Sequence, residues 1–129
     1  MTTPDRVELR RGVDHFNRGE YFEAHEAWEA AWLRASGRLA EFYKGLVQCA
    51  AALHHLGRGN LVGARRLHDR QRLRLAAFSP QTLGVPVARL LADMDELFAA
   101  PGTDGEARTG SRARAMPRIE LDDQAPSTD

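Results

Sequence analysis

The chain has 129 residues, of which 43% are hydrophobic, and its 18 basic residues balance 18 acidic ones, so that the formal net charge at pH 7 is zero. This length suits a single domain with one core, and a neutral chain has no overall field that would attract nucleic acid or a membrane surface. The one cysteine, Cys49, excludes an intramolecular disulfide framework, and with no signal-peptide pattern and no apolar run that could span a bilayer we expect a cytoplasmic protein.

Five segments show the apolar spacing of amphipathic helices, and none shows the strict alternation of a strand. In chain order we expect helices at residues 6–17, 21–35, 39–56, 61–78 and 86–100, separated by glycines or by a Ser-Pro pair. The third helix should lie at the centre of the fold, because residues 45–57 contain no Asp, Glu, Lys or Arg.

From residue 101 onward the periodic apolar residues give way to Gly, Pro, Ser, Thr, Asp and Arg. Such a composition buries too little apolar surface to offset the entropy of ordering the chain. We therefore expect a helical domain at residues 1–100 and a disordered tail at residues 101–129. Residues 116–121 of the tail have enough apolar content to dock on the domain, and the sequence leaves open whether they do.

An internal repeat supports the helical interpretation. Gly19, Tyr21, Ala24 and Trp28 recur 40 positions later as Gly59, Leu61, Ala64 and His68. A glycine turn between antiparallel helices, followed by a small and then a large residue, is typical of the second half of a tetratricopeptide repeat, although that repeat has a period of about 34 residues. We expect an all-α fold, a compact antiparallel bundle of about five helices with two tetratricopeptide-like helix pairs. Two ordinary helical hairpins with coincident glycines are the alternative.

The apolar stripes of these helices contain polar residues that would need buried partners. In the second helix His25 and Glu29 lie one turn apart among bulky apolar groups, whereas Glu26 falls on the opposite, solvated face. The other candidates on core faces are Gln48, His54, His55 and His68. We expect His25 and Glu29 to form one buried cluster with Gln48 and at least one of the three histidines of the third and fourth helices.

No segment matches a known catalytic or metal-binding motif. In His25-Glu26-x-x-Glu29 a glutamate stands where zinc proteases need a second histidine, and Phe22 stands where a di-iron Glu-x-x-His pair needs its glutamate. Cys49 falls on a buried apolar face, where a thiol is inert. We therefore expect no cofactor and no metal, and a satisfied hydrogen-bond network around His25. A metal held by His25, Glu29 and a histidine of another helix is the open alternative.

Two more groups of residues have a structural explanation. The fourth helix carries Arg65, Arg66, Arg70, Arg72 and Arg74 against one acidic residue, Asp69. We expect this basic face to be solvated, or balanced by the acidic face of the second helix, and we expect no nucleic-acid partner because no recognition motif accompanies the arginines. Trp28 and Trp32 indicate core packing in preference to a ligand platform.

The second helix and the turn before it carry a family signature. The stretch Phe16-Asn-x-Gly19-x-Tyr21-x-Glu23-Ala24-His25-Glu26-x-Trp28-Glu29-x-x-Trp32 resembles the domain-of-unknown-function family 309. Weaker resemblances follow at Lys44-Gly-Leu-Val-Gln48, His54-His55, Gly59-Asn60 and Gly63-Ala64, so that the likeness covers about residues 5–78. It implies a small all-helical protein of prokaryotes and plastids with no established activity. It marks as signature positions His25, Glu26, Trp28, Glu29, Trp32 and Gln48.

Two functions are compatible with these observations. The repeat-like helix pairs and the missing catalytic motifs favour a non-enzymatic module that binds a peptide or a partner protein, with a homodimer as one form of this hypothesis. The polar residues within apolar stripes support the alternative, a small enzyme or a ligand- or metal-binding protein that uses His25 and Glu29. A solvent-reachable site at these two residues would favour the alternative.

Overall fold

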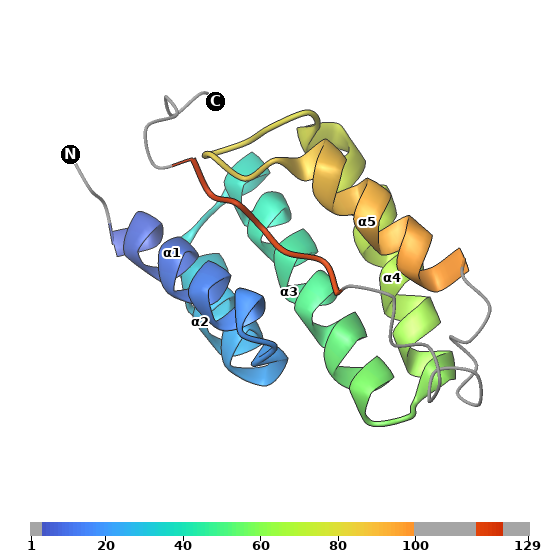
Figure 1. The fold of residues 1–129 in the computed structure, drawn as a ribbon. Helices are drawn as coiled ribbons and strands as arrows, with labels where there is room; N and C mark the ends of the chain where they lie inside the picture. Colours follow the sequence, from blue (N-terminus) through green and yellow to red (C-terminus); the bar gives the residue numbers. More distant parts are fainter. Residues whose placement is uncertain (1–3, 100–115, 123–129) are drawn as a thin grey trace.

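Five α-helices build the domain in the computed structural model, which describes residues 4–99 and 116–122 (Figure 1). The helices are α1 (Pro4–Asn17), α2 (Tyr21–Arg34), α3 (Gly37–Gly57), α4 (Leu61–Leu75) and α5 (Val87–Ala99), and a 3-10 turn, η1 (Ala76–Phe78), extends α4. The predicted all-α bundle is confirmed. The fourth helix, predicted at residues 61–78, is α-helical to Leu75 and ends in the 3-10 turn η1, which is followed by Ser79 and Pro80.

The helices pack as two antiparallel hairpins, α1 with α2 and α3 with α4, and α3 also packs along α2. The two hairpin turns have the same geometry. Gly19 and Gly59 adopt φ values of 80° and 83°, which favour glycine. The amide nitrogen of Glu20 donates to the carbonyl oxygen of His15 over 2.9 Å, and that of Asn60 donates to the carbonyl oxygen of His55 over 2.9 Å. The 40-residue repeat is therefore visible in the backbone, whereas the likeness to tetratricopeptide repeats stays a prediction.

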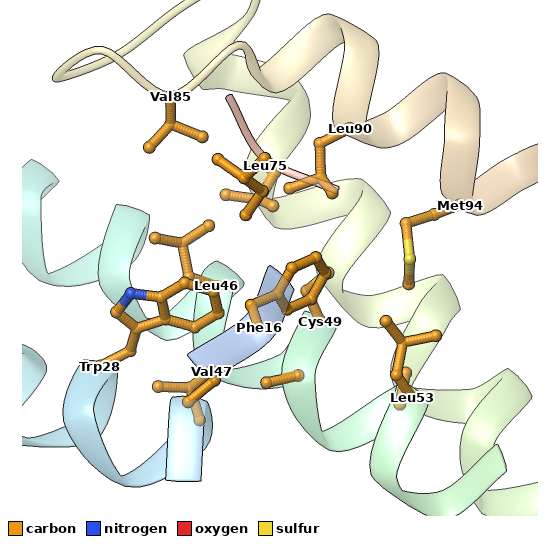
Figure 2. Packing of buried hydrophobic residues seen from close by; sticks show 14 of the residues in the cluster. Phe16, Trp28, Leu46, Val47, Cys49, Leu53, Leu75, Val85, Leu90 and Met94 are labelled. Carbon is orange, nitrogen blue, oxygen red and sulfur yellow. The ribbon is translucent and has the colours of Figure 1, made fainter. Parts of the chain in front are cut away.

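The central position predicted for α3 is confirmed. Its predicted core residues are 0–4% exposed: Phe42, Leu46, Cys49, Leu53 and Leu56. Figure 2 shows Leu46, Cys49 and Leu53 of this set among side chains of other helices, which include Phe16, Trp28, Leu75, Leu90 and Met94. Among the described residues no helix is long and apolar enough to cross a membrane.

The hairpin of α1 and α2 closes over Trp28, whose side chain is 0% exposed. Its indole nitrogen donates to the carbonyl oxygen of Leu9 over 3.2 Å, and the ring of Phe16 lies 5.7 Å away. A Cβ atom at Gly12 would lie 2.1 Å from this nitrogen, so α1 can approach the ring only because residue 12 has no side chain. The predicted core role of Trp28 is confirmed, whereas Trp32 is half-buried at the edge of the core.

Residues 116–122 form an extended strap that runs across the bundle between α1 and α5 (Figure 1, red). The Asn17 side chain donates to the carbonyl oxygen of Ile119 and accepts from its amide nitrogen, both over 2.8 Å, and Ile119 is 1% exposed. Farther along, the amide nitrogen of Asp122 donates to the carbonyl oxygen of Gly84 over 2.9 Å. The segment that the sequence left open therefore docks. The disorder predicted for residues 101–115 and 123–129 lies outside the described residues.

Candidate functional site

The edge between α2 and α3 carries an aromatic cluster made of Phe22, His25 and His54, called here the Phe22 cluster. The ring of Phe22 stacks on that of His25 at 6.1 Å with 13° between their planes, and it lies 5.7 Å from the ring of His54. Phe22 is nevertheless 49% exposed. The Nδ1 atom of the half-buried His25 is itself buried and has no hydrogen-bond partner among the described residues.

Glu29 lies one turn beyond His25 on α2 and is half-buried, whereas Glu26 is exposed, in line with the helical phase expected from the sequence. Within the described part of the chain no hydrogen bond joins Glu29 to His25. Farther along the same edge, the ammonium group of Lys44 lies over the ring of Trp32 at 5.3 Å, a cation–π contact between α3 and α2. The α2–α3 edge is therefore held by ring contacts in place of the expected polar network.

Gln48 faces α4. Its side-chain oxygen accepts a hydrogen bond from Nε of Arg74 over 3.2 Å, and Arg74 also pairs with Glu41 of α3. The expected balance between the arginines of α4 and the acidic face of α2 is corrected by these contacts, because α3 lies between the two helices. Arg72 likewise pairs with Asp95 of α5 over 2.8 Å.

His55 lies in the last turn of α3 and contacts the loop that leads to α4. Its Nδ1 atom lies 3.1 Å from the side-chain nitrogen of Asn60, which can donate to it. The preceding hairpin has the same pairing, since Nδ1 of His15 lies 2.7 Å from the carboxylate of Glu20. The repetition of this contact at both turns indicates that His55 stabilises the turn and does not face His25.

His68 forms a second polar site, between α4 and α5. Its Nε2 atom lies 3.0 Å from the carboxylate of Asp95, its Nδ1 atom lies 3.0 Å from the side-chain nitrogen of Gln71, and its ring stacks on Phe98 at 4.5 Å. With Gln71 donating to Nδ1, the ring carries its proton on Nε2 and donates it to Asp95. Burial lowers the pKa of His68, although the charge of Asp95 acts in the opposite direction.

The structure thus distributes the six candidate residues over several places. At least one of three histidines was expected near His25, and His54 shares the ring of Phe22 with it. The expected place of Gln48 in the same cluster is corrected, because its side chain bonds to Arg74 of α4. His55 bonds to Asn60, and His68 bonds to Asp95 and Gln71. These partners lie on α4, in the turn before it and on α5.

Among residues 4–99 and 116–122, no group of three or more His, Cys, Asp or Glu side chains could hold a metal ion. One signal for the His68 site is present in the sequence, because Gln71 and His68 share the apolar stripe of α4. No such signal marks Asp95, which lies on a helix without any motif.

Residues 9–67 of the chain match the model of a family described as Domain of unknown function (DUF309). This match confirms the resemblance drawn from the sequence. A search of curated proteins found no match. The matched region contains the Phe22 cluster and ends one residue before His68, so that the site between α4 and α5 lies beyond it.

Proposed function

We propose that residues 9–67, which match the DUF309 family model, form a protein-binding module in this chain. The description of that family names no activity. The partner polypeptide binds the outward face of α2, defined by Phe22, Glu26 and Leu33. The observation that carries this proposal is the side chain of Phe22 on α2, which is 49% exposed. An aromatic side chain that remains in contact with water in the free protein gains free energy when a partner covers it.

The surroundings of Phe22 suit an anchor for a partner. Stacking on His25 and contact with His54 restrict the ring before any partner arrives, so binding costs less side-chain entropy. Leu33 is 73% exposed and lies 11 residues farther along α2, which returns it to within about 20° of Phe22 around the helix. Glu26 lies between them and is exposed. This face fits a partner with two apolar side chains and a basic one.

Photo-crosslinking in the cells that produce the protein tests this proposal. A benzoylphenylalanine residue replaces Phe22 in one variant and Val7 of α1 in a control variant, since Val7 is 48% exposed and has no role in the proposed surface. We expect discrete cross-linked proteins from position 22 and none from position 7. The proposal fails if position 22 gives no discrete product or gives the same products as position 7.

A second candidate is a ligand-binding or enzymatic role for His25 and Glu29. One observation favours it, the buried Nδ1 atom of His25 without a partner, because such an atom can bind a small molecule that enters the α2–α3 edge. Native mass spectrometry of the purified protein tests this candidate. A retained small molecule or metal that is lost in His25→Ala would support it, and a spectrum that shows the bare chain would not.

We also propose that the protein works in the cytoplasm. Its one cysteine, Cys49, is a free thiol in the core, a state that suits a reducing compartment.

A further inference from the structure

We infer that the partner of this module is a second copy of the chain, which lays the outward face of its α4 against the outward face of α2. This inference rests on the proposed function and names its partner. The outward face of α4 is defined by Val62, Arg66 and Leu73. Both faces belong to the same molecule, so two copies can satisfy both of them at once.

Exposed apolar side chains mark the two faces. In residues 4–99 and 116–122 six large hydrophobic residues are exposed, and four of them lie on α2 and α4. On α2 these are Phe22 (49%) and Leu33 (73%), and on α4 they are Val62 (68%) and Leu73 (78%). The members of each pair are 11 residues apart and therefore share one side of their helix. The pair on α4 follows the pair on α2 by 40 residues, the period of the internal repeat.

At one pair of equivalent positions between these apolar residues the charges are opposite. Glu26 lies between the apolar residues of α2, and Arg66 stands at the equivalent position of α4. Both side chains are exposed, and neither has an ion pair or hydrogen bond within the described part of the chain. They cannot pair within one molecule, because α2 and α4 pack on α3 from two sides.

One side of the bundle presents both faces together. α2 and α4 run in the same direction on either side of α3 (Figure 1). Along α3 between them, Lys44, Ala51 and His54 are only half-buried, so that no other described element covers this side. Residues 4–99 and 116–122 therefore leave one continuous surface uncovered, and this surface contains the Phe22 cluster.

A two-fold axis parallel to α3 places α2 of each copy against α4 of the other, so that the contact forms twice. Rotation about this axis does not reverse the direction of the helices. Each α2 therefore lies parallel to the partner's α4, and positions that are equivalent in the repeat meet. Phe22 then contacts the partner subunit's Val62, and Glu26 faces the partner subunit's Arg66. Pairing α2 with α2 would place Glu26 against Glu26, and pairing α4 with α4 would place Arg66 against Arg66. The repulsion between these like charges favours pairing α2 with α4.

Charge reversal tests this arrangement in solution. Sedimentation velocity compares the wild-type chain with Glu26→Arg, Arg66→Glu and the double variant, and Glu96→Arg on the exposed surface of α5 is the matched control. We expect a wild-type dimer, a dissociation constant at least tenfold higher in each single variant, and recovery of most of that loss in the double variant. The control should dimerise like the wild type. Leu73→Ser provides a second, uncharged variant that should also weaken the dimer.

The possible failures are distinguishable. A wild-type dimer that the reversals and Leu73→Ser leave intact uses another surface, and this inference is then wrong. A wild-type monomer at high concentration, together with a cross-link from position 22 to a different protein, also overturns the inference but leaves the proposed function standing. A monomer without any cross-link from position 22 overturns both.

Discussion

The close approach of α1 to Trp28 predicts that Gly12→Ala strongly destabilises the fold. The new Cβ atom would lie 2.1 Å from Nε1, 2.4 Å from Cδ1 and 2.5 Å from Cε2 of the indole ring, whereas real contacts of this kind are longer than 3.0 Å. The ring cannot move outward, because it is 0% exposed, lies against Phe16, and donates a hydrogen bond to Leu9. Either the ring or α1 must therefore shift.

Three contributions set the size of the effect. Alanine within a helix is more favourable than glycine by about 0.5–1 kcal/mol. Overpacking a dense core costs about 1–3 kcal/mol, and a buried indole N–H that loses its acceptor costs about 1–3 kcal/mol more. The net loss in the free energy of unfolding is about 3 kcal/mol, which lowers the melting temperature of a domain of this size by roughly 10 °C.

Urea denaturation followed by far-ultraviolet circular dichroism measures this loss for Gly12→Ala and for a matched control, Gly57→Ala. Gly57 is the last residue of α3, and a Cβ atom there would meet nothing within 4 Å. We expect the control to be as stable as the wild type or more stable by up to about 1 kcal/mol. If Gly12→Ala is as stable as Gly57→Ala, the packing of α1 on Trp28 described above is wrong.

Three further predictions concern the strap, the second polar site and the cysteine. Asn17→Ala removes both hydrogen bonds to Ile119 and should cost about 1–3 kcal/mol of stability, with faster amide exchange in the strap as the direct measurement; unchanged exchange there would contradict its anchoring. Burial lowers the pKa of His68 below its usual 6.5 in spite of Asp95, so as the pH falls the unfolded chain binds a proton before the folded chain does. The contribution of His68 to stability is therefore complete above pH 6.5 and is lost as the pH drops toward the lowered pKa. Between pH 7.5 and pH 5 the urea midpoint should fall less for His68→Gln than for the wild type. Burial raises the pKa of the Cys49 thiol, which is 0% exposed, so a thiol reagent should react with it only after denaturation, and rapid labelling of the folded protein would refute this.

Helix positions could be predicted from the sequence because each depends on neighbouring residues. The glycines at 19 and 59 end their helices through positive φ values, a local property that the sequence reveals directly. The face of each helix was equally predictable, since rotation along α2 correctly separated the exposed Glu26 from the half-buried Glu29.

Partners between helices could not be predicted in this way. A helical wheel gives the direction of a side chain from its own axis but not the identity of the neighbouring element. His68 was correctly expected on the core side of α4, yet its partner, Asp95, comes from α5. Gln48 was also correctly expected to be buried, and the long side chain of Arg74 reaches it from the edge of α4. The predicted cluster was wrong for Gln48, because the helical wheel does not show that the partner of this side chain comes from α4.

The strap has a consequence for synthesis on the ribosome. All five helices emerge before residues 116–122, and the contacts within each hairpin join residues close in the sequence, so the hairpins can pack while translation continues. Ile119 pairs with Asn17 across 102 positions, and until it arrives the apolar surface beneath it faces water. The nascent domain therefore passes through a stage in which its helices are assembled but the apolar surface between α1 and α5 is not yet covered by the strap. The strap is the last described segment to be made. A stop codon before it would release a chain with the same helices and an exposed edge of the core.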